Sequence, residues 1–363
     1  MLVADWRNVL VLQTSFLGDL VLTLPLLAEL RRRFPIGKLS LMCTPLGKEL
    51  LQDHPAVDEL IVDDKRREHG GWRGLQSQAA ALRQKNFTIA LTPHKSARSA
   101  YLLYRAAIPQ RIGFRQSKGW FLFHQRAERD PARHDVERNL SVLEPLGVKV
   151  QDCLKRFDLV PTSEVANRVG EKMRQLGVVD GKLTIGINPG SVWPTKRWWS
   201  EGFGQLIGLA KAKFDCQILL FGGPEDRPVA EQLLQRAGGA AVNLAGAFTL
   251  GELPAAIGRC QVFVTNDSGP MHIAVARQVP TVAIFCATTP DLGFYPYSSN
   301  AIVIQKSLHC RPCTSHGGRR CPLVHEHCIR QIAPWTVLAA VEKLLAGQPG
   351  ATADRFLPEF LAA

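Results

Sequence analysis

Acidic side chains are missing from one long segment of the chain. No Asp or Glu lies between His69 and Ala127, although the 363-residue sequence has 32 of them and a formal net charge of +12. The segment is rich in cations instead: Arg73, Arg83, Lys85, Lys95, Arg98, Arg105, Arg111, Arg115, Lys118 and Arg126. This distribution favours an anionic partner, and composition leaves open whether that partner is nucleic acid, phosphorylated lipid or nucleotide.

Long apolar runs are also missing. No window reaches the roughly 20 consecutive apolar residues that a membrane-spanning helix needs. Asp5 and Asp19 interrupt the N-terminal region in which the apolar part of a secretory signal would lie. Most cysteines outside residues 310–328 lie in apolar surroundings, as buried thiols do in a reducing compartment. We therefore expect a cytoplasmic protein.

The standard nucleotide-binding motifs are absent. The sequence has no GxxxxGK[ST] and no GxGxxG after its first expected strand, which argues against a P-loop ATPase and a dehydrogenase. We interpret the basic segment as lacking the interleaved aromatics and the known motifs of nucleic-acid-binding proteins. Specific nucleic-acid binding is therefore the most distant alternative.

Short apolar runs alternate with amphipathic ones along the chain, which is typical of βαβ units around parallel sheets. The first series of expected strands comprises residues 9–13, 38–43, 59–64, 87–92 and 111–114. The second series comprises the strand-and-turn segments 183–190, 216–224, 262–270, 281–290 and the strand 301–305. LVLTLPLLAELRRRF (20–34) predicts a helix that ends in a cluster of arginines. The sequence thus predicts an α/β protein with two Rossmann-like domains, at residues 1–165 and 166–334. Residues 335–363 form a last helix and tail, for which we consider packing back on the first domain.

One charge interrupts the first expected strand-to-helix turn. Asp19 follows Gly18 in TSFLGDLVLTLPLL (14–27) and is the only charge between Arg7 and Glu29. A carboxylate at this position can cap the helix, although Ser15 or Thr14 could cap it instead. Because glycine allows close approach of a substrate, we interpret Asp19 as a general base and keep capping as the alternative.

Three strand-to-turn segments in the second half predict a nucleotide site. The turn in VFVTNDSGPMHIAVA (262–276) starts a helix whose free amides suit a phosphate. TIGINPGSVWPTKRWW (184–199) adds a hydroxyl and a cation, and LLFGGPEDRP (219–228) adds carboxylates that suit ribose hydroxyls. The candidate side chains and amides are Ser191, Lys196, Glu225, Asp226, Asp267, Ser268, Gly269 and His272.

Four cysteines gather near the end of the chain with interspersed histidines. They are Cys310, Cys313, Cys321 and Cys328. Their number and the spacing of the first pair suit a tetrahedral structural zinc ion. The alternative is a loop packed by reduced thiols.

The segments TSFLGDLVLTLPLL, NPGSVWPTKRW, FGGPEDRP, TNDSGPMHIAVA and CRPC…CPLVHEHC, in this order, resemble the ADP-heptose:lipopolysaccharide heptosyltransferases, especially those of type II. The resemblance runs to about residue 345. It implies the GT-B architecture, in which two Rossmann-like domains face each other across a cleft, the first binding the acceptor and the second the nucleotide sugar. It also implies inverting transfer of heptose from ADP-L-glycero-D-manno-heptose to a heptosyl-Kdo-lipid A type acceptor. A GT-B enzyme that uses another nucleotide sugar or acceptor in surface polysaccharide synthesis is the nearer alternative.

The resemblance also implies roles for single residues. Asp19 matches the catalytic carboxylate, and Ser191 and Lys196 match residues near the donor diphosphate. Either Glu225 or Asp226 matches the acidic position near the ribose. The donor loop is matched by Asp267, near the sugar, by the Ser268 and Gly269 amides, near phosphate, and by His272. Two departures are Pro270, where relatives often carry Leu, and the basic insert SHGGRR (315–320).

The implied acceptor gives the basic segment a partner. It carries acidic Kdo sugars and lipid A phosphates at the anionic inner face of the cytoplasmic membrane. We predict acceptor contacts at Gly18, Arg98, Arg111 and Arg115, while a solvated basic face remains the plainer interpretation for any one arginine. The resemblance implies no metal in the transfer step, and we expect a monomer bound peripherally to the membrane.

Overall fold

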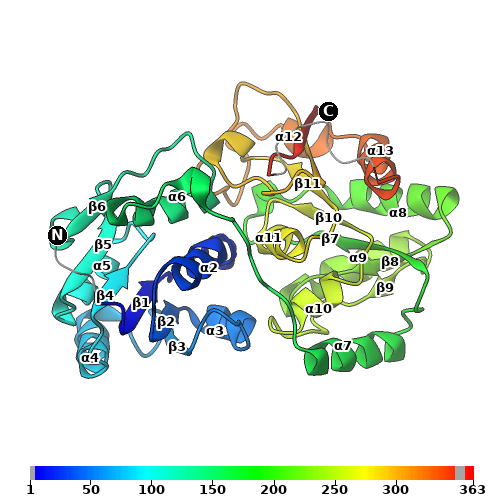
Figure 1. Cartoon of the computed structure of the whole chain (residues 1–363). Helices are drawn as coiled ribbons and strands as arrows, with labels where there is room; N and C mark the ends of the chain where they lie inside the picture. Colours follow the sequence, from blue (N-terminus) through cyan, green and yellow to red (C-terminus); the bar gives the residue numbers. More distant parts are fainter. Residues whose placement is uncertain (1–4, 348–355) are drawn as a thin grey trace. The chain divides into compact units, whose positions relative to one another are not determined.

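The computed structural model describes residues 5–347 and 356–363. It divides into two compact units, which meet in the sequence between Leu159 and Val160 (Figure 1). The boundary that we expected between residues 165 and 166 lies inside helix α7 (Ser163–Gln175), so the second unit begins slightly earlier than expected. Among the described residues, the longest helices are too short or too polar for a bilayer span.

The first unit contains a sheet of parallel strands in the order β3-β2-β1-β4-β5-β6. The strands are β1 (Asn8–Leu12), β2 (Lys38–Cys43), β3 (Glu59–Val62), β4 (Ile89–Leu91), β5 (Gln110–Phe114) and β6 (Gln125–Ala127). Each predicted strand of this half is present, and β6 is an additional short strand at the edge. Side chains of the central strands, such as those of Leu10 and Leu41, are fully buried, as expected for strands that helices cover on both faces.

The helices of the first unit are α1 (Leu17–Val21), α2 (Leu24–Arg33), α3 (Pro45–Leu51), α4 (Gly71–Gln84), α5 (Ala97–Arg105) and α6 (Asp135–Leu140). The sequence predicted one helix from Leu20 to Phe34, and the structure has a break between α1 and α2. Pro25 explains the break, because it lacks an N–H and its ring would clash with the carbonyl of the residue four positions earlier. The break separates the short helix of Asp19 from the longer helix that packs on the sheet.

The second unit has another parallel sheet, in the order β13-β12-β11-β10-β7-β8-β9. Its strands are β7 (Leu183–Asn188), β8 (Cys216–Leu220), β9 (Val242–Asn243), β10 (Val262–Asn266), β11 (Thr281–Phe285), β12 (Ala301–Gln305) and β13 (Glu359–Ala362). The five longer strands were predicted, and the edge strands β9 and β13 were not. The two Rossmann-like units agree with the predicted GT-B class.

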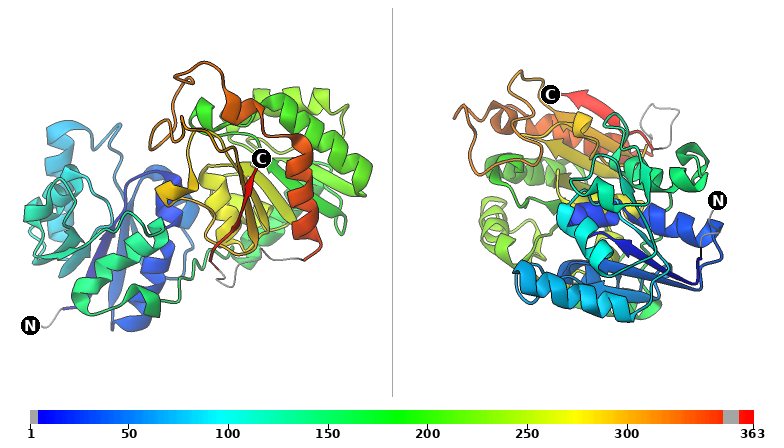
Figure 2. Two further views of the ribbon diagram at one scale, coloured as in Figure 1. Left: turned by 90° about the horizontal axis from the view of Figure 1, so that it is seen from above. Right: turned by 90° about the vertical axis from the view of Figure 1, so that its left-hand side faces the viewer.

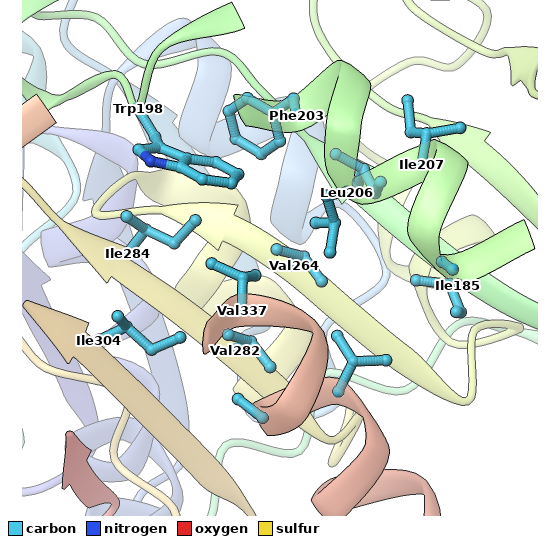
Figure 3. Close-up of a cluster of buried hydrophobic side chains, with 14 of the residues drawn as sticks. Ile185, Trp198, Phe203, Leu206, Ile207, Val264, Val282, Ile284, Ile304 and Val337 are labelled. Atoms are coloured by element: carbon cyan, nitrogen blue, oxygen red, sulfur yellow. The ribbon is translucent and has the colours of Figure 1, made fainter. Parts of the chain in front are cut away.

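The core of the second unit lies between this sheet and its covering helices. The helices are α7, α8 (Ser200–Lys213), α9 (Arg227–Arg236), α10 (Leu253–Ile257), α11 (Gly269–Ala276), α12 (His327–Arg330) and α13 (Pro334–Leu345). Trp198 and Phe203 pack edge to face with ring centroids 4.8 Å apart. They contribute to a cluster with Val264, Ile284 and Val337, which come from two strands and from α13 (Figure 3).

The last helix belongs to this second core. Helix α13 packs on α8 and against β10, β11 and β12, and its buried face includes Val337 and Val341. Beyond residues 348–355, which lie outside the description, β13 pairs with β12 at the edge of the second sheet (Figure 2). The apolar side of α13 is therefore buried against the sheet of its own unit, and the packing of residues 335–363 on the first domain stays a prediction.

Candidate active site

Asp19 lies in α1, directly after the carboxyl end of β1. Its Oδ2 atom accepts hydrogen bonds from the Ser15 hydroxyl at 2.6 Å and from the Phe16 backbone N–H at 3.1 Å. Asp19 is therefore a helix-capping residue, as the alternative interpretation held. The side chain remains half-buried, and within the described residues both of its hydrogen bonds are made by one carboxylate oxygen. Capping therefore leaves the second oxygen available for a proton.

Hydrogen bonds fix the turn that follows Asp19. The Thr23 hydroxyl donates to the Asp19 carbonyl at 2.8 Å and accepts from the Gln13 amide at 3.1 Å. The Asn139 amide, on α6, donates to the Leu22 carbonyl at 3.1 Å. The turn between α1 and α2 is thus held by Gln13, which follows β1, and by Asn139 of α6.

A second carboxylate, Asp135, lies buried behind this turn. Asn139 donates to its Oδ2 atom at 3.4 Å, and Arg129 forms an ion pair with it. Burial raises the pKa of Asp135 to about 6; Arg129 opposes this rise and the negative charge of Asp19 adds to it. The sequence analysis missed Asp135, since the site depends on α6 packing beside α1.

The structure gives the three predicted acceptor arginines different environments. Arg98 forms an ion pair with the buried Asp63, and its NH2 group also donates to the His69 carbonyl at 2.8 Å. Arg111 donates to the Leu122 carbonyl at 2.8 Å. The guanidinium groups of Arg98 and Arg111 therefore make ion-pair and hydrogen-bond contacts within the first unit.

Arg115 is more accessible than the other two. It is exposed and lies 3.4 Å from a carboxylate oxygen of Glu128. Lys65, which the sequence analysis did not select, is closer to the Asp19 turn: its Nζ atom donates to the Thr14 carbonyl at 2.9 Å. Burial lowers the pKa of Lys65, and the charge of nearby Asp63 opposes this change.

In the second unit, the structure brings Lys196 and Asp267 together. Lys196 ends the 3-10 turn η4 (Pro194–Lys196), and its Nζ atom lies 2.6 Å from Asp267 Oδ2. The Thr288 hydroxyl, which follows β11, donates to the same oxygen at 2.6 Å. Turns after β7, β10 and β11 therefore meet at one ion pair, as expected at the carboxyl edge of a parallel sheet.

The Ser191 turn is fastened to the same edge. The Ser191 hydroxyl donates to the Asp267 carbonyl at 3.4 Å, and the Asn266 side chain donates to the Pro189 carbonyl at 2.8 Å. The SHGGRR insert also reaches this region, since a Cβ atom on Gly317 would lie 2.8 Å from Lys196 Cγ. The insert thus packs against one of the candidate donor residues.

The start of α11 supplies the predicted amide end. Ser268 is the N-cap residue with extended backbone, yet its side chain makes no capping hydrogen bond, and Pro270 occupies the first turn. The Ser268 hydroxyl instead lies 3.2 Å from the Thr265 hydroxyl. The Gly269 end of the helix therefore presents backbone N–H groups of the kind that bind phosphate.

His272 lies in the first turn of α11 and is buried. Burial lowers its pKa to about 4, with Lys196 acting in the same direction and Asp267 in the opposite one. The imidazole is therefore neutral near pH 7. Its Nδ1 atom has no hydrogen-bond partner within the part of the chain that is described.

Glu225 and Asp226 differ in what they contact. Asp226 accepts from the Gly223 backbone N–H at 3.1 Å, and a Cβ atom on Gly190 would lie 2.4 Å from its Oδ2 atom. Burial raises the pKa of Asp226. Glu225, in the same 3-10 turn η5 (Pro224–Asp226), is exposed. The Asp226 carboxylate thus contacts the backbone at Gly223 and Gly190. Glu225 is the carboxylate that faces solvent.

The cysteine cluster is only partly assembled. Cys310 Sγ lies 4.0 Å from His325 Nε2, and the Cys313 thiol donates to the Cys310 carbonyl at 3.4 Å. Burial raises the pKa of the Cys328 thiol to about 11. Over residues 5–347 and 356–363, no three His, Cys, Asp or Glu side chains are grouped closely enough to hold a metal ion. The structural zinc ion and the loop of packed thiols both stay predictions for this cluster.

Comparison with known proteins places these features in a family. Residues 76–323 match glycosyltransferase family 9 (heptosyltransferase). Lipopolysaccharide heptosyltransferase 2 of Escherichia coli K12 is 30% identical over 316 residues, which cover 82% of this chain and 88% of that protein.

Solved structures of two proteins have the same fold. A family 9 glycosyltransferase from Veillonella parvula superposes with a TM-score of 0.82 at 27% identity, and the match covers 94% of this chain and 98% of that one. The ADP-heptose lipopolysaccharide heptosyltransferase II of E. coli superposes with a TM-score of 0.76 at 25% identity, covering 94% and 99% of the two chains.

Proposed function

Because the chain belongs to glycosyltransferase family 9, we propose that it transfers heptose from ADP-L-glycero-D-manno-heptose to the inner core of lipopolysaccharide. The observation that carries this proposal is the meeting of Lys196, Asp267 and the start of α11 at one edge of a Rossmann-like sheet. The similar E. coli protein is named for ADP-heptose. A heptosyl-Kdo-lipid A type molecule is the proposed acceptor.

Asp19 is the proposed base. The acceptor hydroxyl gives its proton to the Asp19 carboxylate as its oxygen bonds to the anomeric carbon of the donor. The bond from that carbon to the diphosphate breaks on the opposite face, so the configuration inverts and ADP leaves. The hydrogen bonds from Ser15 and Phe16 hold one oxygen of Asp19 in place during this step.

The second unit is proposed to bind ADP. Lys196, Ser191 and the Ser268 and Gly269 amides face the diphosphate, where negative charge increases as the leaving group departs. Neutral His272 acts as a hydrogen-bonding group there, and Asp267 lies near the sugar. Glu225 is favoured over Asp226 for the ribose hydroxyls because Asp226 already bonds to Gly223.

The proposal includes the cellular location of the protein. We expect the protein to act as a monomer on the cytoplasmic side of the inner membrane, where a lipid-linked acceptor presents its sugars. Gly18 and Arg115 remain proposed acceptor contacts, and Lys65 joins them because it lies beside the Asp19 turn. Arg98 and Arg111 can contribute positive potential even though their hydrogen bonds are used within the fold.

Product analysis tests the activity. The protein is incubated with ADP-heptose and a defined acceptor that carries heptose and Kdo, and the products are analysed by mass spectrometry. We expect one added heptose and released ADP, with no transfer from UDP-glucose or UDP-N-acetylglucosamine. Transfer only from a UDP-sugar would support the alternative GT-B enzyme of surface polysaccharide synthesis and overturn the heptose assignment.

Metal removal tests the proposed chemistry. We expect the initial rate to be unchanged in EDTA after a short incubation, because Lys196 and backbone amides can stabilise the leaving diphosphate without a divalent ion. The measurement compares rates with EDTA, with Mg²⁺ and with neither. Loss of activity that Mg²⁺ restores would contradict this mechanism. Loss restored only by Zn²⁺, together with a lowered melting temperature, would favour a structural zinc at the cysteine cluster.

A further inference from the structure

Several large aromatic side chains of the first unit are exposed. They are Trp72 on α4, Tyr104 on α5, and Trp120 and Phe121 in the 3-10 turn η1 (Trp120–Leu122). Their exposed fractions are 62%, 48%, 47% and 64%, respectively. With half-buried Tyr101 they form what we call the aromatic–basic surface. Exposed apolar side chains that are gathered rather than scattered mark interaction sites.

Contacts between side chains show that this surface is continuous. The Tyr101 ring lies 5.4 Å from the Trp72 ring and 6.4 Å from the Tyr104 ring, measured between centroids. Arg111 lies over Tyr104, 5.6 Å from its centroid, and donates to the Leu122 carbonyl of η1. Helices α4 and α5 lie side by side (Figure 1), and η1 contacts α5. Residues far apart in the sequence thus share one face.

Many exposed cations accompany these rings. The exposed cations are Arg73 and Arg83 on α4, Arg105 on α5, Lys118 just before η1 and Arg126 on β6. No acidic residue occurs between His69 and Ala127. Arg126 lies over the Trp120 ring, 4.9 Å from its centroid. The surface therefore combines Trp and Tyr side chains with cations, which is the composition that anchors proteins at a lipid headgroup layer.

We propose that the aromatic–basic surface docks the protein onto an anionic lipid bilayer. The rings of Trp72, Trp120 and Phe121 enter the headgroup region, and the surrounding Lys and Arg side chains contact lipid phosphates. This inference deepens the proposed function, on which it rests, because a lipid-linked acceptor is met at such a surface.

A lipid surface fits these contacts better than a nucleic acid does. Single-stranded nucleic acids bind by stacking bases on open aromatic faces. In this structure Arg126 covers one face of Trp120, and Arg111 covers one face of Tyr104. The rings nevertheless remain half-exposed, which suits insertion between headgroups.

Vesicle binding by the full-length protein tests the proposal. Cosedimentation is measured with phosphatidylcholine vesicles that contain or lack phosphatidylglycerol. We expect binding to the anionic vesicles, weakened at high salt, and a loss of about tenfold in the double variant Trp120→Ser/Phe121→Ser. The double variant Arg105→Gln/Lys118→Gln should lose about fivefold for each charge removed.

Trp335→Ser is the matched control for the aromatic substitutions. Trp335 is 70% exposed on α13, in the second unit and outside the aromatic–basic surface. We expect this variant to bind vesicles as the wild type does. Equal losses in all variants, or none in the Trp120/Phe121 variant, would overturn the proposal. Binding to single-stranded RNA is measured for the same variants. A Trp120→Ser/Phe121→Ser variant that loses RNA binding but keeps vesicle binding would also overturn the proposal. Melting temperatures establish that each variant is folded.

A water-soluble acceptor separates this proposal from the proposed function. With a heptose–Kdo oligosaccharide that lacks lipid, the Trp120/Phe121 variant should transfer heptose at the wild-type rate. If the wild type does not transfer heptose at all, the proposed function fails, whereas vesicle binding is judged by its own result. If transfer to the soluble oligosaccharide falls in parallel with vesicle binding, the surface serves the sugar acceptor and the bilayer assignment is wrong.

Discussion

Asp19→Asn is expected to lower the rate of heptose transfer by about 10²–10⁴-fold, the usual contribution of a general base. Asparagine has nearly the same size as aspartate and can still accept hydrogen bonds from Ser15 and Phe16 through its oxygen. It cannot take the proton of the acceptor hydroxyl. The measurement is the turnover rate at saturating ADP-heptose, with ADP affinity determined separately by calorimetry.

Two further variants make this test specific. Asp64→Asn changes a half-buried carboxylate of the same unit that caps another turn through the backbone N–H groups of Arg66 and Arg67. Its transfer rate should stay near that of the wild type. Asp19→Ala should be as inactive as Asp19→Asn but also less stable by about 1 kcal/mol, because it loses the cap. Wild-type turnover in Asp19→Asn would leave Asp19 with a capping role alone.

ADP affinity should not change in Asp19→Asn. Asp19 belongs to the first unit, and the proposed ADP-binding residues all belong to the second. A large loss of ADP affinity would indicate that Asp19 acts through donor binding, in which case the proposed base lies elsewhere.

The strands and the order of the motifs could be predicted from the sequence because each buried strand leaves a local pattern in it. Buried strands of parallel sheets are continuous apolar runs, and each run before a Gly- or Asp-containing turn became a strand, as with β10 before Asp267. The short edge strands lacked this signal. β9 has two residues and β13 alternates half-buried and exposed side chains, so neither has the run that marks a buried strand.

The contacts within the candidate site depend on tertiary packing. The Lys196–Asp267 pair joins turns that only the sheet brings together. We predicted that Arg98 contacts the acceptor. Its ion pair with the buried Asp63 could not be foreseen, because it depends on how α5 packs beside the end of β3. The interpretation that residues 69–127 lack interleaved aromatics was wrong. The rings of the aromatic–basic surface lie in that segment, but they come from α4, α5 and η1 and show no regular spacing along the chain.

Lys196→Ala is expected to weaken ADP binding by roughly 10- to 150-fold, which corresponds to about 1.5–3 kcal/mol for a hydrogen bond to a charged group. The substitution has two effects in the same direction. It removes a cation proposed to face the diphosphate. It also breaks the ion pair of the buried Asp267, whose Oδ2 atom then keeps the hydrogen bond from the Thr288 hydroxyl but not the contact with Lys196. The unbalanced carboxylate then repels the diphosphate. Isothermal calorimetry with ADP measures the change.

Lys213→Ala is the control for charge. Lys213 is an exposed cation of the same unit, paired with Glu342 at 2.6 Å, and its removal should leave ADP affinity unchanged. An unaltered ADP affinity in Lys196→Ala would contradict the diphosphate assignment. An equal loss of ADP affinity in both variants would mean that the loss comes from the change in net charge and not from Lys196 itself.

The double variant Lys196→Ala/Asp267→Asn separates the two effects. If the repulsion from an unpaired Asp267 contributes, the double variant should bind ADP more tightly than Lys196→Ala does, although less tightly than the wild type. Equal affinities in the single and double variants would mean that Lys196 acts only by direct contact with the diphosphate. Because the carboxylate lies 2.6 Å from Lys196 Nζ, the two charges are close enough to be energetically coupled, and we expect the partial recovery.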